Sequence, residues 1–414
     1  MKAAVAALMR IRAFGALRYP QYRLLSYVQI FSNVGTWMEE VTRGWLIYQL
    51  TDSVFQLGLV RGVQLLPLML LSPLAGSAAD RYSRKTLLLV AQGASVAVFA
   101  VMAVLIFTGQ VRPWHVYLAA VLAGATQVFQ QPARASLVSD TVPLEYLTNA
   151  IGLNSLIFNM ARIGGPVVAG ALIAAWGTGS AYTVQAVCLL LATAWTLQLR
   201  PQQRHGDAAR HAQRESFGQS ILEGWRFSWR SAPVRAGLMC TLIVSLLIAP
   251  FTTLLPVFAR DLFQVGAAGQ GLMLTAMGLG ALVSSGLIAF IGHKITRGRV
   301  MLESSMLYGI VLVVFAFSPW FSLSLAVMVL AGLFHVHANA LVHTVIQSHS
   351  PSEFRGRTMA LFNMTQLLST AGGMLLGVVA SWLGPQWAVA VLGLTGSVAI
   401  ALLSRALPHA RQIK

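Results

Sequence analysis

The stretch Gly76-Ser-Ala-Ala-Asp80-Arg81-Tyr-Ser-Arg84-Lys85 lies between two apolar runs, at residues 54–76 and 86–108. Each run has about the 20 residues that an α-helix needs to cross a bilayer. A short connection rich in Arg and Lys is typical of the cytoplasmic side of a membrane. This stretch therefore predicts two membrane-spanning helices joined by a basic loop, and similar apolar runs continue in both directions.

The composition of the whole chain agrees with a membrane protein. Of its 414 residues 56% are hydrophobic and 10% are charged, and the mean hydropathy is +0.69. Soluble globular domains have about 25% charged residues. These values exclude a soluble enzyme, a nucleic-acid-binding protein and a secreted domain, so the net charge of +17 does not indicate a nucleic-acid partner.

The length predicts twelve spans, because one span and its connection take about 34 residues. The apolar stretches lie at residues 24–50, 54–76, 86–108, 114–138, 148–176, 179–199, 236–258, 268–292, 299–318, 320–346, 357–383 and 386–407. We therefore expect an all-α integral membrane protein of twelve transmembrane helices in two pseudo-symmetric six-helix bundles.

The basic residues are distributed unevenly between the two sides of these spans. When the 29 Lys and Arg are sorted by span boundaries, 24 fall on one side and two on the other, and three lie within spans. In this sorting Arg134, near the end of the stretch 114–138, is counted on the basic side. The positive-inside rule then predicts that both termini are cytoplasmic. The first 20 residues have no secretory signal pattern and are expected to form a basic arm on the inner surface.

The chain divides at one polar stretch, and its halves resemble each other. At an offset of 208 residues, nine of 44 positions are identical without a gap, including Pro143 with Pro351 and Glu145 with Glu353. Within the polar stretch, Ser216–Trp229 has the pattern of an amphipathic helix at the membrane interface. The expected parts are an N-terminal arm 1–21, a bundle 22–199, a cytoplasmic linker 200–235, a second bundle 236–408 and a tail 409–414.

Several chemistries are not indicated. Cys188 and Cys240 fall within predicted spans, which gives neither a zinc site nor a disulfide framework. No clustered catalytic set is visible, so an enzyme is not expected. No phosphate-binding G-x-x-x-x-G-K-[ST] sequence occurs, so we expect transport driven by an ion gradient and no cofactor. A channel or receptor is less favoured, since duplicated halves with a long linker suit alternating access.

The stretch from Gly76 to Lys85 matches the G-x-x-x-D-R-x-x-R-K signature of the major facilitator superfamily. The chain resembles members of that superfamily over nearly its whole length. The resemblance implies a conformational gate in which acid and bases form ion pairs at the cytoplasmic rim, made of Gly76, Asp80, Arg81, Arg84 and Lys85. The alternative, a solvated basic loop, explains Arg84 and Lys85 but not a Gly and an Asp at this spacing.

The fifth span carries a second signature of the superfamily. Gly152, Ala161, Gly165-Pro166, Ala169 and Gly170 follow the spacing G-x8-G-x3-G-P-x2-G-G, with Ala at two Gly positions. In the superfamily this motif marks antiporters and accompanies export, which implies an exporter with Gly152, Gly165, Pro166 and Gly170 as its motif residues. The alternative is a tightly packed helix without directional meaning.

A further resemblance is to the branch that contains macrolide and siderophore exporters. It is carried by Gly35-Thr-Trp-Met38, by Trp45-Leu-Ile-Tyr-Gln-Leu-Thr51 and by Arg355-Gly-Arg357. One departure matters: the Arg that proton-coupled members have four residues before a Gly in the fourth span corresponds to Ala120, ahead of Gly124. That proton route is therefore not implied for this chain.

The first span has a polar face. Its members fall within an arc of about 120° on a helix: Gln29, Ser32, Asn33, Thr36, Glu39, Glu40 and Arg43. A charge at mid-bilayer costs about 2.5 to 3.5 kcal/mol, so this face must point to protein or water. A structural ion pair of Arg43 with either Glu is one interpretation. Since one Arg cannot neutralise two carboxylates, the second Glu either pairs with Arg61 or Arg162 or holds a proton and couples transport to it.

The tenth span carries His335, Asn339, His343 and Gln347 at intervals of four residues. Hydrogen-bonded interior groups, proton handling and a metal site are possible for them, in falling order of support, since no carboxylate or Cys accompanies the two His. The predicted substrate and proton pathway comprises Asn33, Glu39, Glu40, Arg43, Arg61, Asn159, Arg162, His335, Asn339 and His343.

These observations predict a secondary active exporter of a small amphiphilic molecule, a drug or siderophore-like compound, working by alternating access and proton antiport. The alternative is a lipid or metabolite facilitator of the same fold. The expected partners are the substrate, the proton gradient and the lipid bilayer, and the expected state is a monomer in the bacterial inner membrane. The three Arg and two Glu within spans favour neither a purely cationic nor a purely anionic substrate.

Overall fold

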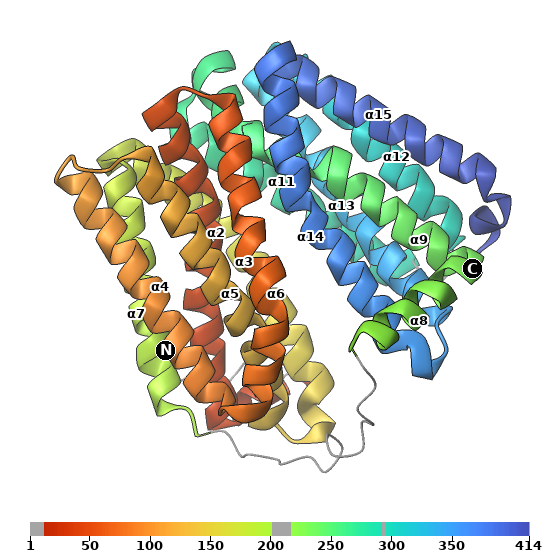
Figure 1. Cartoon of the computed structure of the whole chain (residues 1–414), viewed down its shortest axis with the longest axis horizontal. Helices are drawn as coiled ribbons and strands as arrows, with labels where there is room; N and C mark the ends of the chain where they lie inside the picture. Colours follow the sequence, from red (N-terminus) through yellow and green to blue (C-terminus); the bar gives the residue numbers. More distant parts are fainter. Residues whose placement is uncertain (1–11, 201–216, 292–294, 414) are drawn as a thin grey trace. The chain divides into compact units, whose positions relative to one another are not determined.

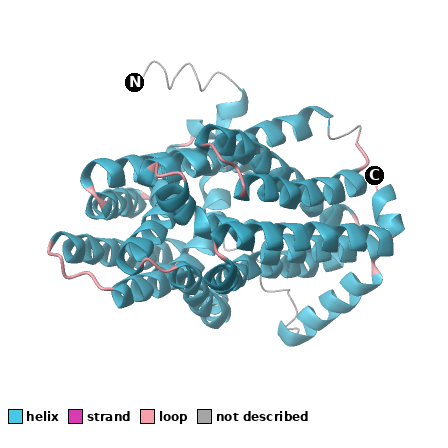
Figure 2. Ribbon diagram, turned by 90° about the horizontal axis from the view of Figure 1, so that it is seen from above, coloured by secondary structure: helices cyan, strands magenta, loops and turns pink. Residues whose placement is uncertain are grey.

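The computed structural model describes residues 12–200, 217–291 and 295–413. In these ranges the chain forms helices and no strand, which confirms the all-α prediction (Figure 2). The helices before the linker are η1 (Arg12–Arg18), α2 (Pro20–Thr51), α3 (Val54–Arg81), α4 (Arg84–Phe107), α5 (Pro113–Thr141), α6 (Leu144–Trp176) and α7 (Thr178–Gln198). After it come α8 (Phe217–Arg230), α9 (Ala232–Ile243), η3 (Val244–Ile248), η4 (Ala249–Leu254), α10 (Leu255–Val257), η5 (Phe258–Leu262), α11 (Gly266–Ile291), α12 (Arg297–Ala316), α13 (Phe321–Ser348), α14 (Ser352–Leu383), α15 (Pro385–Ala406) and η6 (Pro408–Gln412).

Most of these helices are long and apolar enough to cross a bilayer. Ten segments in the described ranges meet that condition, with the run Ala232–Leu262 counted as one. The remaining long helices, α2 and α5, have comparable lengths of 32 and 29 residues but carry charged side chains along their course. A helix with such groups crosses a membrane only where they face protein or water.

Several helices extend beyond the apolar stretches that predict them. The helix α3, predicted as the second span at 54–76, continues to Arg81. Only Tyr82 and Ser83 therefore separate it from α4. The helix α5 continues to Thr141, so that Arg134, which the sorting of basic residues counts on the basic side, lies two turns inside the helix. Polar residues near the ends of long helices extend them past the hydrocarbon region, and hydropathy alone does not detect these turns.

The chain separates into two compact units (Figure 1). Unit 1 contains the residues up to Thr51, those from Val63 through α7, and the first turn of α11, Gly266–Gly271. Unit 2 contains Asp52–Gly62 at the start of α3, together with the described residues from α8 through Val265 and from Leu272 onward. The predicted bundle boundaries at 22–199 and 236–408 stay a prediction.

The segment predicted as one helix at residues 236–258 lies within one helical run, Ala232–Leu262, whose helix type changes along its length. Its α9 part ends at Ile243 and is followed by a π-helical turn, a 3-10 turn, a short α-turn and a second π-helical turn ending at Leu262. Pro250 and Pro256 lie within this run, and each removes a backbone donor and clashes with the preceding turn. The π-helical turn η3 after α9 packs closely on α14, where a Cβ at Gly372 would lie 2.5 Å from the Leu246 carbonyl oxygen.

The described part of the N-terminal arm is docked on α6. Ala16 is fully buried, and its backbone N–H donates to Asn149 Oδ1 at 2.8 Å. The hydroxyl of Tyr22 donates to the Ala150 carbonyl at 2.7 Å, and the rings of Tyr19 and Tyr146 meet edge to face at 5.3 Å. These contacts join the arm to the beginning of α6.

The amphipathic helix predicted at Ser216–Trp229 is present as α8, Phe217–Arg230. One face of α8 packs on the start of α14, where the rings of Phe227 and Phe354 stack at 4.7 Å and Glu223 forms an ion pair with Arg357. On the other face, Trp225 and Trp229 are stacked on each other and about half exposed. The location of this face at the membrane interface stays a prediction.

Candidate functional site

The polar face of α2 has partners on several helices of unit 1. Gln92 of α4 donates to Ser32 Oγ at 3.2 Å and accepts from Thr196 Oγ1 of α7 at 2.9 Å. Gln185 of α7 donates to Thr42 Oγ1 at 2.8 Å. Since Gln92 and Gln185 are fully buried, these bonds hold α2 against α4 and α7 and serve packing.

The charged residues of α2 form a buried ion pair. Arg43 Nε lies 2.6 Å from Glu39 Oε1, and the two side chains are 3% and 10% exposed. Arg43 also donates from Nη1 to Gln64 Oε1 of α3 at 3.0 Å. Glu40, the next residue after Glu39, is half-buried. The structure thus places Glu39 in an ion pair with Arg43.

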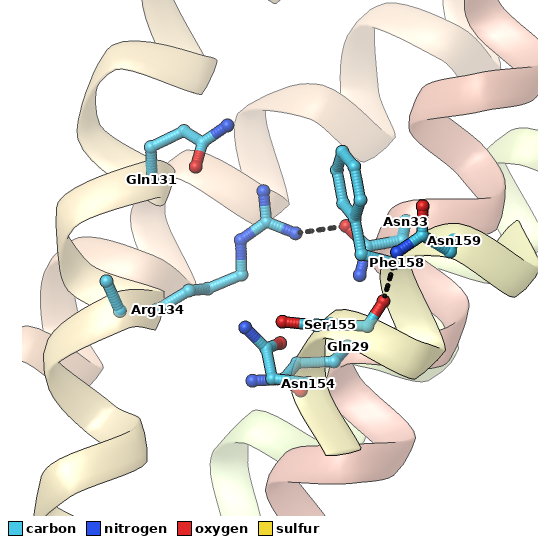
Figure 3. A pocket seen from close by; sticks show the side chains of 9 residues that line it. Gln29, Asn33, Gln131, Arg134, Asn154, Ser155, Phe158 and Asn159 are labelled. Carbon is cyan, nitrogen blue, oxygen red and sulfur yellow. Dashed lines mark hydrogen bonds between the residues drawn. The ribbon is translucent and has the colours of Figure 1, made fainter. Parts of the chain in front are cut away.

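A polar pocket of about 260 Å³ lies one to three turns from this pair along α2, and we call it the Arg134 pocket (Figure 3). It is lined from α2, α5 and α6 by Gln29, Asn33, Gln131, Arg134, Ala135, Asn154, Ser155, Phe158 and Asn159. Side-chain amides thus dominate the wall around one guanidinium. Such a set offers both donors and acceptors and is suited to hold a polar group of a small molecule.

Arg134 is the only charged side chain among these lining residues, and it points into the pocket (Figure 3). Its Nη1 donates to Asn33 Oδ1 at 3.4 Å, and it forms no ion pair within the described ranges of the chain. Gln29 is 2% exposed, and its Oε1 accepts no hydrogen bond from the described residues. The pocket therefore carries a positive charge and a buried acceptor, both available to a bound group.

Two predicted pathway residues line this pocket, namely Asn33 and Asn159, whose Nδ2 donates to the Ser155 carbonyl at 2.8 Å. Arg162 lies one turn further along α6, with its guanidinium over the Trp37 ring at 5.5 Å. Sequence analysis missed Arg134 as a pocket residue because it counted Arg134 among the basic residues on one side of the membrane. The signal was present in α5, where Gln127, Gln130, Gln131 and Arg134 recur at helical spacing.

The other predicted pathway residues belong to unit 2. His335 of α13 packs its ring on Tyr308 at 5.1 Å, and His343 meets Phe362 edge to face at 5.7 Å. Asn339 is half-buried between them on α13, and Arg61 lies beside Gly373 of α14. No group of three metal-binding side chains occurs in the part of the chain that the structure describes.

A hydrogen bond missed by the sequence analysis joins α11 and α13. His337, which is 8% exposed, lies 3.2 Å from Ser284 Oγ through its Nδ1. His337, which lies between the predicted residues His335 and Asn339, therefore has a buried polar partner on α11.

The structure gives contacts for two of the five predicted gate residues, Arg84 and Lys85. Arg84 Nη1 lies 2.5 Å from Asp140 Oδ2 at the end of α5. Lys85 Nζ donates to the carbonyl oxygens of Leu197 and Leu199 at 2.6 and 2.8 Å. Gly76, Asp80 and Arg81 lie in the last turns of α3, and their side chains are outside the described part of the structure. Arg84 and Lys85 thus connect the start of α4 with the ends of α5 and α7.

The motif in α6 contains both packed and open positions. A Cβ at Gly165 would lie 2.7 Å from Trp37 Cβ of α2, and a Cβ at Gly170 would lie 2.6 Å from the Ala267 carbonyl oxygen in the first turn of α11. At Gly152 and Gly164 an added Cβ would meet nothing within 4 Å. Gly165 therefore sets the approach of α6 to α2 two residues before Glu39.

We expect Gly165→Leu to abolish efflux, because the new side chain must separate α6 from α2 next to the Glu39–Arg43 pair. Overpacking of this kind costs about 1–3 kcal/mol, so the thermal midpoint of the purified protein should fall as well. The matched control is Gly164→Leu, which adds the same side chain at the neighbouring open position. Equal efflux by the two variants would contradict a packing role for Gly165.

The comparison with protein families decides the identity of the chain. The model of the transmembrane secretion effector family, MFS_3, matches residues 11–413. This protein belongs to that family. Members of the family are transporters of the major facilitator superfamily, so the resemblance inferred from the gate motif is confirmed, and the protein is a membrane transporter and not an enzyme.

Relatives of this transporter carry related names. The Staphyloferrin A transporter of Staphylococcus aureus is 24% identical over 369 residues, covering 87% of this chain and 90% of its own length. The multidrug efflux pump Tap of Mycobacterium tuberculosis is 27% identical over 368 residues and 85% of each chain. The enterobactin exporter EntS of Salmonella choleraesuis is 25% identical over 395 residues, covering 93% and 91%.

Solved structures with the same fold have low sequence identity. The nucleoside transporter NupG superposes with a TM-score of 0.73 at 13% identity, covering 95% of this chain and all of the other. A bacterial homologue of the lysosomal transporter Spinster gives 0.71 at 14% identity, covering 94% and 95%. At these identities the likeness establishes the fold of this secretion effector transporter.

Proposed function

We propose that this protein is a secondary active exporter that exchanges a small amphiphilic molecule, drug-like or siderophore-like, for protons. The observation that carries the proposal is the arrangement on α2, where two carboxylates at Glu39 and Glu40 share the face with Arg43, and the Arg134 pocket lies further along the same helix. The names of the relatives, a siderophore transporter, a drug efflux pump and an enterobactin exporter, support export of such molecules.

The Arg134 pocket favours a substrate with a negatively charged oxygen group. A guanidinium binds a carboxylate or a similar group through two parallel hydrogen bonds, and Gln131 and Asn154 add amide donors on the wall. Gln29 Oε1 supplies an acceptor for a hydroxyl or N–H on the same molecule. A volume of 260 Å³ holds only the polar end of an amphiphile, with its apolar part outside the pocket.

We expect Arg134→Gln to weaken substrate binding by about 10- to 100-fold, because a charge-assisted hydrogen bond contributes about 1.5–3 kcal/mol. Arg134→Lys keeps the charge but loses the bidentate geometry, so its affinity should fall between those of Gln and wild type. Isothermal titration of purified protein measures both. Wild-type affinity in Arg134→Gln would exclude the pocket as a binding site.

In the proposed cycle Glu40 takes up and releases the coupling proton, while Glu39 stays paired with Arg43. The Gly76 to Lys85 stretch acts as the conformational gate, since its bases can release Asp140 and the carbonyl groups at the end of α7 when the helices move. We further propose the orientation of the positive-inside rule, with both termini cytoplasmic in a bacterial inner membrane, and a monomeric state.

The test of this function compares substrate accumulation in intact cells with and without the protein. Cells that contain the transporter should accumulate less of its substrate, and dissipating the proton gradient with a protonophore should remove the difference. Under the alternative, a lipid or metabolite facilitator, the substrate equilibrates and the protonophore has no effect. Proteoliposomes with an imposed pH gradient then separate a direct effect of protons from an effect of cell energy.

A further inference from the structure

Besides the Arg134 pocket of unit 1, the structure has a cavity in unit 2 with a basic wall and an apolar wall. It has a volume of about 580 Å³ and lies between the first turns of α12, the last turns of α15 and η6. The helices α12 and α15 run side by side (Figure 1), and in the described ranges the chain direction places the start of one beside the end of the other. This cavity has no part in the transport scheme described above, and we call it the α12–α15 cavity.

The walls of this cavity are held in place by backbone contacts. The Ser397 hydroxyl donates to the Met306 carbonyl at 2.8 Å, and a Cβ at Gly393 would lie 2.9 Å from the Gly309 carbonyl oxygen. The Gly298 N–H donates to the Ile413 carbonyl at 3.0 Å, which fastens the chain after η6 to the start of α12. The shape of the cavity is therefore set by the packing of α12 against α15 and of the segment after η6 against α12.

Three arginines lie on the polar side of the α12–α15 cavity: Arg299, Arg405 and Arg411. Glu303 is the only acid among the lining residues, and it pairs with Arg299 at 2.6 Å. Arg411 is held by Nε, which donates to Ser404 Oγ at 2.7 Å. Three positive charges face one negative charge, so the cavity attracts an anion, and guanidinium groups match the geometry of phosphate oxygens.

The opposite side of the cavity is apolar and lies deeper along the helices. Leu302 and Met306 follow Arg299 by one and two turns of α12, and Ile400 precedes Arg405 by more than one turn of α15. On the adjoining face of α15, Val398 and Leu402 are 49% and 57% exposed, as expected of side chains that contact acyl chains. The polarity therefore changes from basic to apolar in the direction in which a phospholipid changes from headgroup to chain.

We propose that the α12–α15 cavity binds an anionic phospholipid, with its phosphate against Arg405 and Arg411 and its acyl chains along α12 and α15. Basic pockets between transmembrane helices at the cytoplasmic side are the form that such lipid sites take. A free phosphate ion would use the arginines but not the apolar wall. The lipid and the ion are therefore distinguished by whether binding needs the acyl chains.

The full-length protein, purified in detergent, tests the proposal with phosphatidylglycerol, phosphatidylcholine and inorganic phosphate as separate probes. We expect phosphatidylglycerol to raise the thermal midpoint and to remain as an adduct in native mass spectrometry, because a ligand of the folded state stabilises it. Phosphatidylcholine and inorganic phosphate should do neither. Stabilisation by inorganic phosphate equal to that by phosphatidylglycerol would overturn the lipid assignment.

Variants that remove positive charges and a variant that removes a negative charge should change lipid binding in opposite directions. The double change Arg405→Gln with Arg411→Gln should weaken phosphatidylglycerol binding at least tenfold, and Glu303→Gln should strengthen it several-fold because it removes the only acid of the cavity. The control is Arg355→Gln, which removes one exposed charge outside the cavity and should leave binding unchanged. Unchanged binding in the double variant, or weaker binding in Glu303→Gln, would refute the site.

Discussion

Replacing Glu40 with Gln should abolish substrate efflux that is driven by an imposed pH gradient, while the protein remains folded and still binds substrate. The reason lies in the division of roles on α2. Glu39 is paired with Arg43 at 2.6 Å. Glu40 is half-buried and follows Glu39 directly on the same helix. A carboxyl group in such surroundings can bind and release a proton during the cycle.

The matched variant is Glu39→Gln, which makes the same chemical change one residue away. It leaves Arg43, 3% exposed, as a buried charge without its carboxylate, and the loss of one partner from a buried ion pair costs about 3–5 kcal/mol. We therefore expect a clearly lower thermal midpoint for Glu39→Gln.

Proteoliposomes measure the two activities separately. Under an imposed pH gradient Glu40→Gln should give no net efflux, whereas exchange of labelled for unlabelled substrate without a gradient should continue, since exchange needs no net proton movement. Glu40→Asp, which keeps the carboxyl group, should restore part of the gradient-driven rate. Wild-type rates under the gradient in Glu40→Gln would end the assignment of this residue to coupling.

Replacing Gly332 with Ala should cause a large loss of stability in unit 2. A Cβ at Gly332 of α13 would overlap the Met277 carbonyl group of α11, and a Cβ at Gly280 of α11 would overlap the Val329 carbonyl group of α13. The two backbones therefore touch, as in other membrane helix pairs with small residues at their crossing. Separating them also strains the bond between Ser284 and His337 on the same pair of helices.

We expect Gly332→Ala and Gly280→Ala each to cost about 1–3 kcal/mol or more, because the contact is with rigid backbone and not with a flexible side chain. The measurements are the thermal midpoint in detergent and the fraction of monodisperse protein after solubilisation. The control is Gly286→Ala on the same helix α11, where a Cβ would meet nothing within 4 Å. A midpoint for Gly332→Ala equal to that of Gly286→Ala would show that the crossing can open without cost.

The sequence alone determined the class of the protein. Apolar runs of span length and the uneven placement of Lys and Arg are one-dimensional signals, since a helix satisfies its own backbone in the membrane without help from distant residues. The gate motif likewise indicated the superfamily. The polar face of α2 was also readable, because charged groups within a span must be turned away from lipid whatever they contact.

Only the tertiary structure decided what these groups contact. That Arg43 pairs with Glu39 depends on side-chain geometry, since Glu40 also lies at helical spacing from Arg43. The Arg134 pocket required three helices to be placed together, and the α12–α15 cavity joins residues about a hundred positions apart. The sequence analysis also did not predict the change of helix type after α9 or the contact of Gly332 with α11. Hydropathy records how apolar a segment is, whereas packing depends on which backbone lies against it.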